Sequence, residues 1–555
     1  MKNRFLIGSL LLSLFISASP SNAVDTTPIP LWQSTPTFGM DLSDSFGNFG
    51  LTGSLLSTLA MIPETEILNT TKYNRICPSL EVDYCNPQKD QLTASAVLKP
   101  CLEDFSNPCI RGLRIIDQKG EVFETEYVRS VKGPTFKGSP AFNLPDGGTT
   151  SLWRSEKVSG DKDFAVKYSI DYSFNTPNTN GFEPFQLSVS IAPFIARPHS
   201  QAREYFFEET TPSNPLRSIL GWGIRSVGGN DFGVNCVWQE AGLCGAEQEF
   251  EKDFYYELDL LIPKKFSGWL HGRLVSPEIS VKTVTQDLNE MKIKAKSAEV
   301  PRLVVDVDYS NANETFAELF KSNKSFVSKR GFRQLPMVDN FDSVKMLDGF
   351  AKFHNDKANL KSTKWTFRNV KFPGTSNKCL DSDSQLMGMV TTNSLIYDGG
   401  IPAFRDGFLQ YRVAGLHYNP DGSEFKGAYD LLLRSEAARC LYGFSNAPIS
   451  AEISVLGTDG DKKIATTQIS ESNGWLHLGA YNFTFSQPTI NILFKQEVAA
   501  PTPSPSPSEL TTPSQVAMPI VKSPIIKTSI TCIKGRTTKK VTAVKPKCPA
   551  GYKKK

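Results

Sequence analysis

Hydrophobic and polar residues alternate along much of the first half of the chain, and this pattern predicts β-strands. Phe164–Ile170 and Phe185–Ile191 repeat with a period of two, as half-buried strands do. Phe254–Ile262 is a longer strand-like run that ends at Pro263. Three further runs continue the series: Ile279–Thr285, Met291–Ala295 and Leu303–Val307. Residues 24–310 are therefore predicted to form a β-rich domain with an N-terminal extension.

The spacing of apolar residues becomes helical in residues 311–360. Glu314–Phe320 and Phe341–Phe353 place apolar residues three and four positions apart. A stripe that faces a protein core is a commoner cause of this pattern than a membrane-contact face. We expect a helical connector here. In the N-terminal extension, Leu51–Ile62 predicts one more short helix.

Residues 361–497 return to short strand-like runs separated by turn signals, of which Asn419-Pro420-Asp421-Gly422 is the clearest. The expected strands are 365–367, 408–413, 429–433, 449–456, 464–469 and 481–485. This spacing predicts a C-terminal β-sandwich of immunoglobulin size. The Cys…Trp…Cys order of immunoglobulin domains is absent because Trp365 precedes both Cys379 and Cys440. Jelly-roll and other sandwich topologies stay open. The expected fold is mainly β, with two sandwich-like domains joined by the helical connector.

One tetrapeptide, Gly-Trp-Leu-His, occurs twice, at residues 268–271 and 474–477. Each copy follows a strand-like run and precedes a second run that a proline opens, Pro277 or Pro488. The four candidate binding residues are Trp269, His271, Trp475 and His477. They have two interpretations: a Trp face with an adjacent His that binds a sugar ring, or a buried Trp that closes a β-unit with the His at its rim. The second is favoured, because a buried Trp commonly anchors such folds.

The first 23 residues have the pattern of a secretory signal peptide. Lys2 and Arg4 precede an apolar run, Phe5–Ile16, and Ser21-Asn22-Ala23 forms a small-x-small cleavage site. The run is too short to span a bilayer, and no later stretch approaches the roughly 20 apolar residues that a membrane helix needs. We therefore expect a secreted protein without a transmembrane segment.

Ten cysteines fit an oxidising compartment, and their spacing favours pairing between neighbours. The expected pairs are Cys77/Cys85, Cys101/Cys109, Cys236/Cys244, Cys379/Cys440 and Cys532/Cys548. In the chain-entropy model a nine-residue loop contributes about 2.5 kcal/mol and the long 379–440 loop about 4 kcal/mol. A zinc site is disfavoured because the chain has no C-x-x-C and only five His.

The chain ends in a stiff linker and a basic tail. Residues 498–527 contain Pro501-Thr502-Pro503-Ser504-Pro505-Ser506-Pro507-Ser508, which favours an extended polyproline conformation. Residues 528–555 are predicted to be a small disulfide-stapled hairpin. The tail cations expected to bind the envelope are Lys534, Arg536, Lys539, Lys540, Lys545, Lys547, Lys553, Lys554 and Lys555.

The charge of the tail contrasts with that of the body. Residues 510–555 carry eleven Lys/Arg and no Asp/Glu, while the other residues carry 50 Lys/Arg against 57 Asp/Glu. Such a tail is drawn to polyanions, and outside a cell these are wall polymers, anionic lipid or released DNA. The tail lacks an aromatic stacking platform, which argues against specific nucleic-acid recognition. The alternative is a tail that only confers solubility.

Two segments carry a resemblance to known proteins. Ile530–Gly535 with Lys545–Lys555 resembles a short tail found on many secreted proteins of freshwater and related actinobacteria. Arg439-Cys440-Leu441-Tyr442-Gly443-Phe444, followed by the second Gly-Trp-Leu-His, resembles an uncharacterised β-domain of such proteins. The resemblance covers about the last third of the chain. It implies a secreted or surface-retained bacterial protein and brings no catalytic residues.

Motifs of common enzyme classes are missing. The sequence has no G-x-S-x-G, H-E-x-x-H, P-loop or dinucleotide fingerprint. The S-x-x-K at Ser423 to Lys426 follows a turn instead of opening a helix. Carboxylates gather at 247–253 and at Glu208-Glu209, where a solvated acidic face is a commoner cause than a glycosidase pair. Asp306, Asp308, Asn311, Asn313 and Glu314 offer oxygen ligands for Ca²⁺ but lack the EF-hand glycine and distal Glu.

The sequence therefore predicts a secreted or cell-surface β-protein with a binding, adhesive or structural role and no cofactor. Its expected partners are anionic envelope polymers, with carbohydrate as a further candidate. The alternative is a secreted β-fold hydrolase, similar to a glycosidase, that acts on polysaccharide. A cleft lined by two facing carboxylates and exposed aromatic residues would favour the hydrolase.

Overall fold

A computed structural model describes most of the chain, and two compact units divide it at residue 498: Met1–Val498 and Ala499–Lys555. The predicted leader and linker lie outside the described residues. The structure describes residues 37–43, 57–62, 75–87, 91–102, 105–155, 157, 162–174, 181–200, 202, 204, 206–209, 224–227, 236–308, 332–334, 337–370, 377–382, 385–445, 449–457, 462–463, 465–485, 488–496, 528–534, 537–543, 548 and 552–554.

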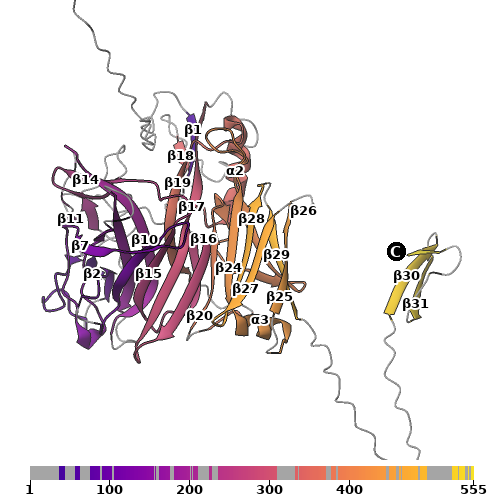
Figure 1. Cartoon of the computed structure of the whole chain (residues 1–555), viewed down its shortest axis with the longest axis horizontal. Coiled ribbons are helices and arrows are strands. Elements are labelled where there is room, and N and C mark those ends of the chain that lie inside the picture. Colours follow the sequence, from indigo (N-terminus) through magenta and orange to yellow (C-terminus); the bar gives the residue numbers. More distant parts are fainter. Residues whose placement is uncertain are drawn as a thin grey trace, which may run out of the picture. The chain divides into compact units, whose positions relative to one another are not determined.

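The first unit is mainly β, as predicted, and is organised around one long sheet, which we call the shared sheet (Figure 1). Most neighbours pair antiparallel, and β16 pairs with β20 in parallel. In spatial order its strands are β3 (Arg75–Ile76), β2 (Thr58–Ile62), β4 (Gln91–Val97), β9 (Asp163–Phe174), β10 (Glu183–Pro198), β19 (Leu360–Val370), β16 (Gly268–Thr283), β20 (Leu386–Thr392), β24 (Gly427–Arg434), β28 (Trp475–Phe483) and β27 (Thr466–Ser472).

Shorter strands extend this sheet or pair apart from it. Four of them extend β9 and β10: β7 (Glu126–Ser130), β8 (Ser151–Arg154), β13 (Cys236–Glu240) and β14 (Leu243–Glu247). β11 (Phe206–Glu209) and β12 (Ile224–Val227) form a separate ribbon, and η2 (Pro140–Phe142) is a short 3-10 turn.

Two cover sheets lie against the shared sheet. The N-terminal cover sheet contains β6 (Val122–Glu124), β5 (Cys109–Ile116), β15 (Tyr255–Pro263), β17 (Leu288–Asp308) and the second half of β16. The C-terminal cover sheet contains β21 (Ile396–Tyr397), β22 (Ala403–Arg405), β23 (Phe408–Ala414), β29 (Thr489–Gln496), β25 (Ile449–Leu456) and β26 (Lys462–Lys463). The end of β17 pairs with β1 (Thr37–Leu42), which also pairs with β18 (Phe332–Gln334).

The two cover sheets pack on opposite faces of the shared sheet. Leu432 of β24 belongs to the core that contains Leu258 and Ile293 of the N-terminal cover sheet. Its neighbours Leu431 and Leu433 belong to the core formed with the C-terminal cover sheet. Consecutive residues of a strand point to opposite faces, so the uninterrupted Leu431–Leu433 run is apolar because both faces are buried. The predicted boundary at the connector therefore separates two β-regions that share one sheet.

β16 connects the shared sheet to the N-terminal cover sheet through a bulge. Its first half pairs with β19 and β20, and its second half pairs with β17 after a register shift between Val275 and Glu278. Ser276 has a left-handed backbone at this point, with φ of 51°. The prediction that Pro277 opens a new strand is wrong: β16 runs through it, because a bulge is a position where a strand tolerates proline. In the second copy, Pro488 does precede a separate strand.

The helical connector is confirmed in its second part. η5 (Phe341–Ser343), α2 (Val344–Ala351) and η6 (Lys352–His354) follow one another, and Met346, Leu347 and Phe350 face the core. The expected helix at 314–320 lies outside the described residues. The expected helix at 51–62 is wrong over Thr58–Ile62, which pairs with β4 and buries Leu59. One helix was not predicted, α3 (Ser435–Tyr442), which ends at Gly443 in the left-handed conformation.

Four of the five expected disulfides are present. Cys77–Cys85, Cys101–Cys109 and Cys236–Cys244 close short loops, and Cys379–Cys440 ties the segment before β20 to α3. Cys548 is also disulfide-bonded. Among the described residues no helix is long and apolar enough to cross a bilayer.

The second unit is a small sheet of three strands. β30 (Thr528–Lys534) pairs antiparallel with β31 (Thr537–Ala543) and with β32 (Lys553–Lys554). The register sets Lys539 and Lys554 opposite Cys532, one on each side. The hairpin expected in the tail is confirmed, with a third strand added. Four of the predicted tail cations lie outside the described residues: Arg536, Lys545, Lys547 and Lys555.

Candidate functional site

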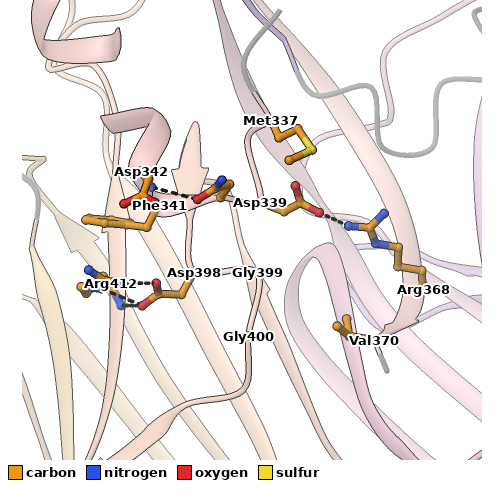
Figure 2. Close-up of a pocket in the computed structure, with 11 residues that line it drawn as sticks. Met337, Asp339, Phe341, Asp342, Arg368, Val370, Asp398, Gly399, Gly400 and Arg412 are labelled. Carbon is orange, nitrogen blue, oxygen red and sulfur yellow. Dashed lines mark hydrogen bonds and ion pairs between the residues drawn. The ribbon is translucent and has the colours of Figure 1, made fainter. Parts of the chain in front are cut away.

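A pocket of about 440 Å³ lies where the helical connector meets the shared sheet and the C-terminal cover sheet. Four segments that are distant in sequence form its walls (Figure 2). The lining residues are Met337, Asp339, Asn340, Phe341, Asp342, Arg368, Val370, Asp398, Gly399, Gly400 and Arg412. None of these residues was predicted as a candidate from the sequence. The site is assembled from four segments that are distant in the chain, and a local sequence motif cannot predict such an assembly.

One wall of the pocket carries a bidentate ion pair between Arg412 of β23 and Asp398, which follows β21. Arg412 donates from Nε to Asp398 Oδ2 at 3.0 Å and from Nη2 to Oδ1 at 2.6 Å. These hydrogen bonds raise the pKa of Arg412 above its usual value. The guanidinium also lies 4.3 Å from the ring centroid of Phe341, a cation–π arrangement. Arg412 is thus held in one orientation by a carboxylate and an aromatic face.

A second ion pair forms the other wall. Arg368 of β19 donates from Nη2 to Asp339 Oδ2. The two carboxylates do not face each other: Figure 2 shows Asp339 directed toward Arg368 and Asp398 directed the opposite way, toward Arg412. An arginine at ion-pair distance stabilises an ionised carboxylate. Asp339 and Asp398 therefore do not form the opposed acid and base pair of a glycosidase.

The backbone between the two ion pairs is closely packed. Tyr397 N donates to Val338 O at 3.0 Å, and Asp398 N donates to Arg412 O at 3.1 Å. A Cβ on Gly399 would lie 2.1 Å from the Asp339 carbonyl oxygen, so this position accepts glycine alone without a shift of the backbone. The pocket walls are consequently fixed before any ligand arrives.

His271 lies behind the pocket, near the Gly400 backbone. Its ring is 2% exposed and packs 6.1 Å and 6.3 Å, between centroids, from the rings of Tyr397 and Tyr411. Neither ring nitrogen forms a hydrogen bond of normal geometry. Burial, reinforced by the positive charge of Arg368, lowers the pKa of His271 to about 3, while the Gly400 backbone opposes the shift. The imidazole is therefore neutral at physiological pH and adds no charge to the pocket.

The two tryptophans of the repeated tetrapeptide are also buried. The indoles of Trp269 and Trp475 are 2% and 5% exposed. Trp269 donates from Nε1 to Leu380 O at 2.8 Å, and the Arg434 guanidinium lies 4.3 Å from the Trp475 ring centroid. Neither ring offers a free face to a sugar, so the packing of both tryptophans agrees with the structural interpretation. The expected place of the histidine at a rim is wrong for His271, which is buried among aromatic rings.

His477 belongs to a polar network that the sequence did not reveal. Its Nε2 lies 2.8 Å from Oδ1 of Asp430, a fully buried carboxylate. The Tyr481 hydroxyl donates to the same oxygen, and Ser276 N donates to Oδ2 at 3.1 Å. Burial, together with the Asp430 charge, raises the pKa of Tyr481 far above its usual value, so the phenol stays a donor. The network connects the β16 bulge to β24 and β28, and its donors surround Asp430 without leaving space for a substrate.

In the described acidic cluster at residues 247–253, the carboxylates are paired with other side chains. Glu247 pairs with Lys364 at 3.1 Å, Glu251 with Lys162 at 2.6 Å, and Asp253 with Lys296 at 2.9 Å. Glu249 accepts from Thr363, and the side chains of Glu208 and Glu209 lie outside the described residues. Of the Ca²⁺ candidates, Asp306 lies exposed on β17, and the side chains of Asp308, Asn311, Asn313 and Glu314 lie outside the described residues. Across the described part of the chain, no group of three His, Cys, Asp or Glu side chains is placed to hold a metal ion.

Comparison with known proteins adds no relative to this picture. No protein-family model matches the chain, and no curated protein matches it.

Proposed function

We propose that this chain is a secreted or cell-surface β-protein that acts through binding or structure and is retained at the cell envelope by its basic C-terminal unit. The observation that best supports this proposal is that residues 499–555 form a compact unit of their own. Its strands contain five lysines, Lys534, Lys539, Lys540, Lys553 and Lys554. No Asp or Glu follows residue 509 in the sequence. The pattern of residues 1–23 and the disulfides support an extracellular location.

The physical basis of retention is electrostatic. Eleven cations without a neighbouring acid attract a polyanion, and a preformed sheet loses less conformational entropy on binding than a flexible tail. In the sequence, a segment rich in Pro and Ser lies between this charge and the acidic body. Anionic wall polymers or lipid headgroups of an actinobacterial-type envelope are the partners that this chemistry favours.

The geometry of the pocket supports binding over hydrolysis. A glycosidase needs one carboxylic acid to donate a proton and a second carboxylate across the scissile bond. Asp339 and Asp398 point away from each other, and each is paired with an arginine. We therefore assign the body of the protein a binding or structural role in this proposal.

Deletion of residues 510–555 tests the retention role. We expect the full-length protein in the envelope fraction and the truncated protein in the medium, both measured by immunoblot of fractionated cultures. A control variant with every tail lysine changed to arginine keeps the charge and should stay on the envelope. High salt should release the full-length protein, because salt screens exposed charges. Retention of the truncated protein at the wild-type level would contradict the proposal.

A further inference from the structure

We propose that the pocket between the Arg368–Asp339 and Arg412–Asp398 pairs binds one residue of a neutral, hydroxyl-rich saccharide. Its volume of about 440 Å³ lies within the roughly 300–1,000 Å³ that is typical of small-ligand sites. The inference concerns the body of the protein and does not depend on the role of the tail.

The charges of the pocket select a neutral ligand. Three carboxylates, those of Asp339, Asp342 and Asp398, face two guanidinium groups. Each guanidinium is neutralised by an aspartate, and the buried His271 is uncharged. A phosphate or carboxylate would therefore enter a site with a small excess of negative charge and would compete with aspartates already in place.

The hydrogen-bonding groups of the pocket match hydroxyl groups. Arg412 uses Nε and Nη2 for Asp398, and its remaining nitrogen, Nη1, keeps two N–H donors. Asp398 Oδ2 accepts from both Nε and the backbone N–H of Arg412, whereas Oδ1 accepts from Nη2 and keeps a further lone pair. A pair of adjacent hydroxyls can accept from the arginine and donate to the aspartate at once. A ligand that lacks either hydroxyl would form one hydrogen bond fewer with this pair, so the arrangement favours a diol.

Apolar surface at the same site suits the C–H face of a sugar ring. Met337 lines the pocket with 65% of its surface exposed, which is unusual for a large hydrophobic residue with no described role in the core. Phe341 lines it as well, half-buried and held beside the Arg412 guanidinium. A pyranose can place its hydroxyl edge on Arg412 and Asp398 and its apolar face on Met337 or Phe341.

The site is also rigid enough to be selective. The loop that carries Asp398 is fixed to the connector by the Tyr397–Val338 hydrogen bond, and Gly399 lets it lie against the Asp339 carbonyl. A ligand therefore does not have to order these groups, and this preserves affinity for a small molecule.

Isothermal titration calorimetry of the full-length protein tests the proposal. The probes are neutral disaccharides with gluco, galacto and manno configuration, together with glucuronic acid and glucosamine. We expect at least one neutral sugar to bind. Arg412→Lys should weaken that binding about tenfold, because lysine lacks the planar guanidinium whose N–H donors pair with a diol. Met337→Ala, a change at an exposed position that cannot unfold the protein, should weaken it about threefold.

Arg154→Lys is the matched control. Arg154 forms the same bidentate pair with Asp163, at 2.8 Å and 2.7 Å, and its side chain is 55% exposed, as is that of Arg412. It lies on β8, outside the pocket, and should change the affinity less than twofold. Three results would overturn the proposal: no binding of any neutral sugar, binding that both pocket variants leave unchanged, or tighter binding of glucuronic acid than of its neutral parent. The first two results do not bear on retention at the envelope, because neutral sugars are not attracted to the lysine-rich tail. Glucuronic acid is an anion that the tail attracts, so the third result is taken only from the part of its binding that Arg412→Lys changes.

Discussion

Trp269 and Trp475 occupy the same position in two identical tetrapeptides, yet their side chains point to opposite faces of the shared sheet. Trp269 packs in the core beneath the C-terminal cover sheet, and Trp475 packs in the core beneath the N-terminal one. The register across β16, β20, β24 and β28 explains the difference, because it aligns Trp269 with Gly388, Leu433 and Leu476. Trp269 is therefore level with Leu476 and not with Trp475, so the second tetrapeptide is displaced by one residue along its strand. A displacement of one residue moves each side chain to the other face of the sheet.

Gly388 is the residue that lets Trp269 lie flat against β20. A Cβ at this position would be 2.3 Å from Cζ3 of the Trp269 ring. We expect Gly388→Ala to lower the free energy of unfolding by about 1–3 kcal/mol, since the ring has no space to move within the core. Urea denaturation followed by tryptophan fluorescence measures this loss.

Gly112→Ala is the control for that substitution. Gly112 also lies within a strand, β5, but a Cβ there meets no heavy atom within 4 Å. Alanine should be neutral or slightly stabilising at this site, because glycine weakens a strand interior. Equal losses for the two variants would show that Trp269 does not depend on a glycine beneath it.

Local signals in the sequence predicted the local structure well. Alternation of hydrophobic and polar residues predicted β9, β10 and β15. The helical spacing of apolar residues predicted the helix and turns between Phe341 and His354. The eight-residue intervals between cysteines predicted three disulfides. Each of these depends on residues close in the chain. Two further features of the sequence indicate structure that was not predicted. Gly443 is a typical helix terminator and marks the end of α3, and the apolar run Leu431–Leu433 indicates a strand that is buried on both faces.

The shared sheet and the pocket could not be predicted in the same way. Arg368 and Asp339 meet because β19 inserts between β10 and β16, and Asp398 meets Arg412 through pairing of β21 with β23. Such contacts depend on the order of the strands in the sheet. The hydrophobic period and the amino-acid composition of the sequence do not determine that order. The same limit applies to Asp430, whose partners come from β16 and β28.

Asp430 should be the most sensitive polar residue in the body. Asn in its place would turn one of the two acceptor oxygens into an NH2 group, which would oppose either the Ser276 N–H on the Oδ2 side or the His477 and Tyr481 groups on the Oδ1 side. We expect Asp430→Asn to lower the free energy of unfolding by about 3 kcal/mol, because buried donors would lose their acceptor. Thermal and urea denaturation at neutral pH measure the loss.

A double-mutant cycle separates the network from general damage. Tyr481→Phe alone should cost about 1 kcal/mol, and it should cost less in the Asp430→Asn background, where the tyrosine has already lost its acceptor. Asp163→Asn, which breaks an exposed ion pair with Arg154, should change stability by less than about 1 kcal/mol. Additive effects of the two network substitutions would show that Asp430 and Tyr481 act separately.

His271 should make the folded protein sensitive to acid. Burial lowers its pKa to about 3 in the folded state, while in the unfolded chain the pKa is near the ordinary value of 6.5. Between pH 6.5 and pH 3 the unfolded state therefore binds a proton that the folded state does not. The folded state loses stability as the pH falls through this window, by about 1.4 kcal/mol per pH unit at most.

His271→Leu should remove this contribution. We expect the slope of unfolding free energy against pH, measured from pH 6.5 to 4, to be smaller in the variant than in the wild type, whatever its absolute stability. An unchanged slope in His271→Leu would contradict the burial effect.

The Cys379–Cys440 disulfide should contribute more stability than any of the short-loop disulfides. It joins residues 61 apart in sequence, whereas Cys101–Cys109 joins residues eight apart. In the chain-entropy model the long loop restricts the unfolded state by about 4 kcal/mol and the short loop by about 2.5 kcal/mol. The long link also holds the segment whose Leu380 carbonyl accepts from Trp269. Paired Cys→Ala variants of the two disulfides, compared by urea denaturation, should lose stability in this order, and the reverse order would show that native-state packing outweighs loop length.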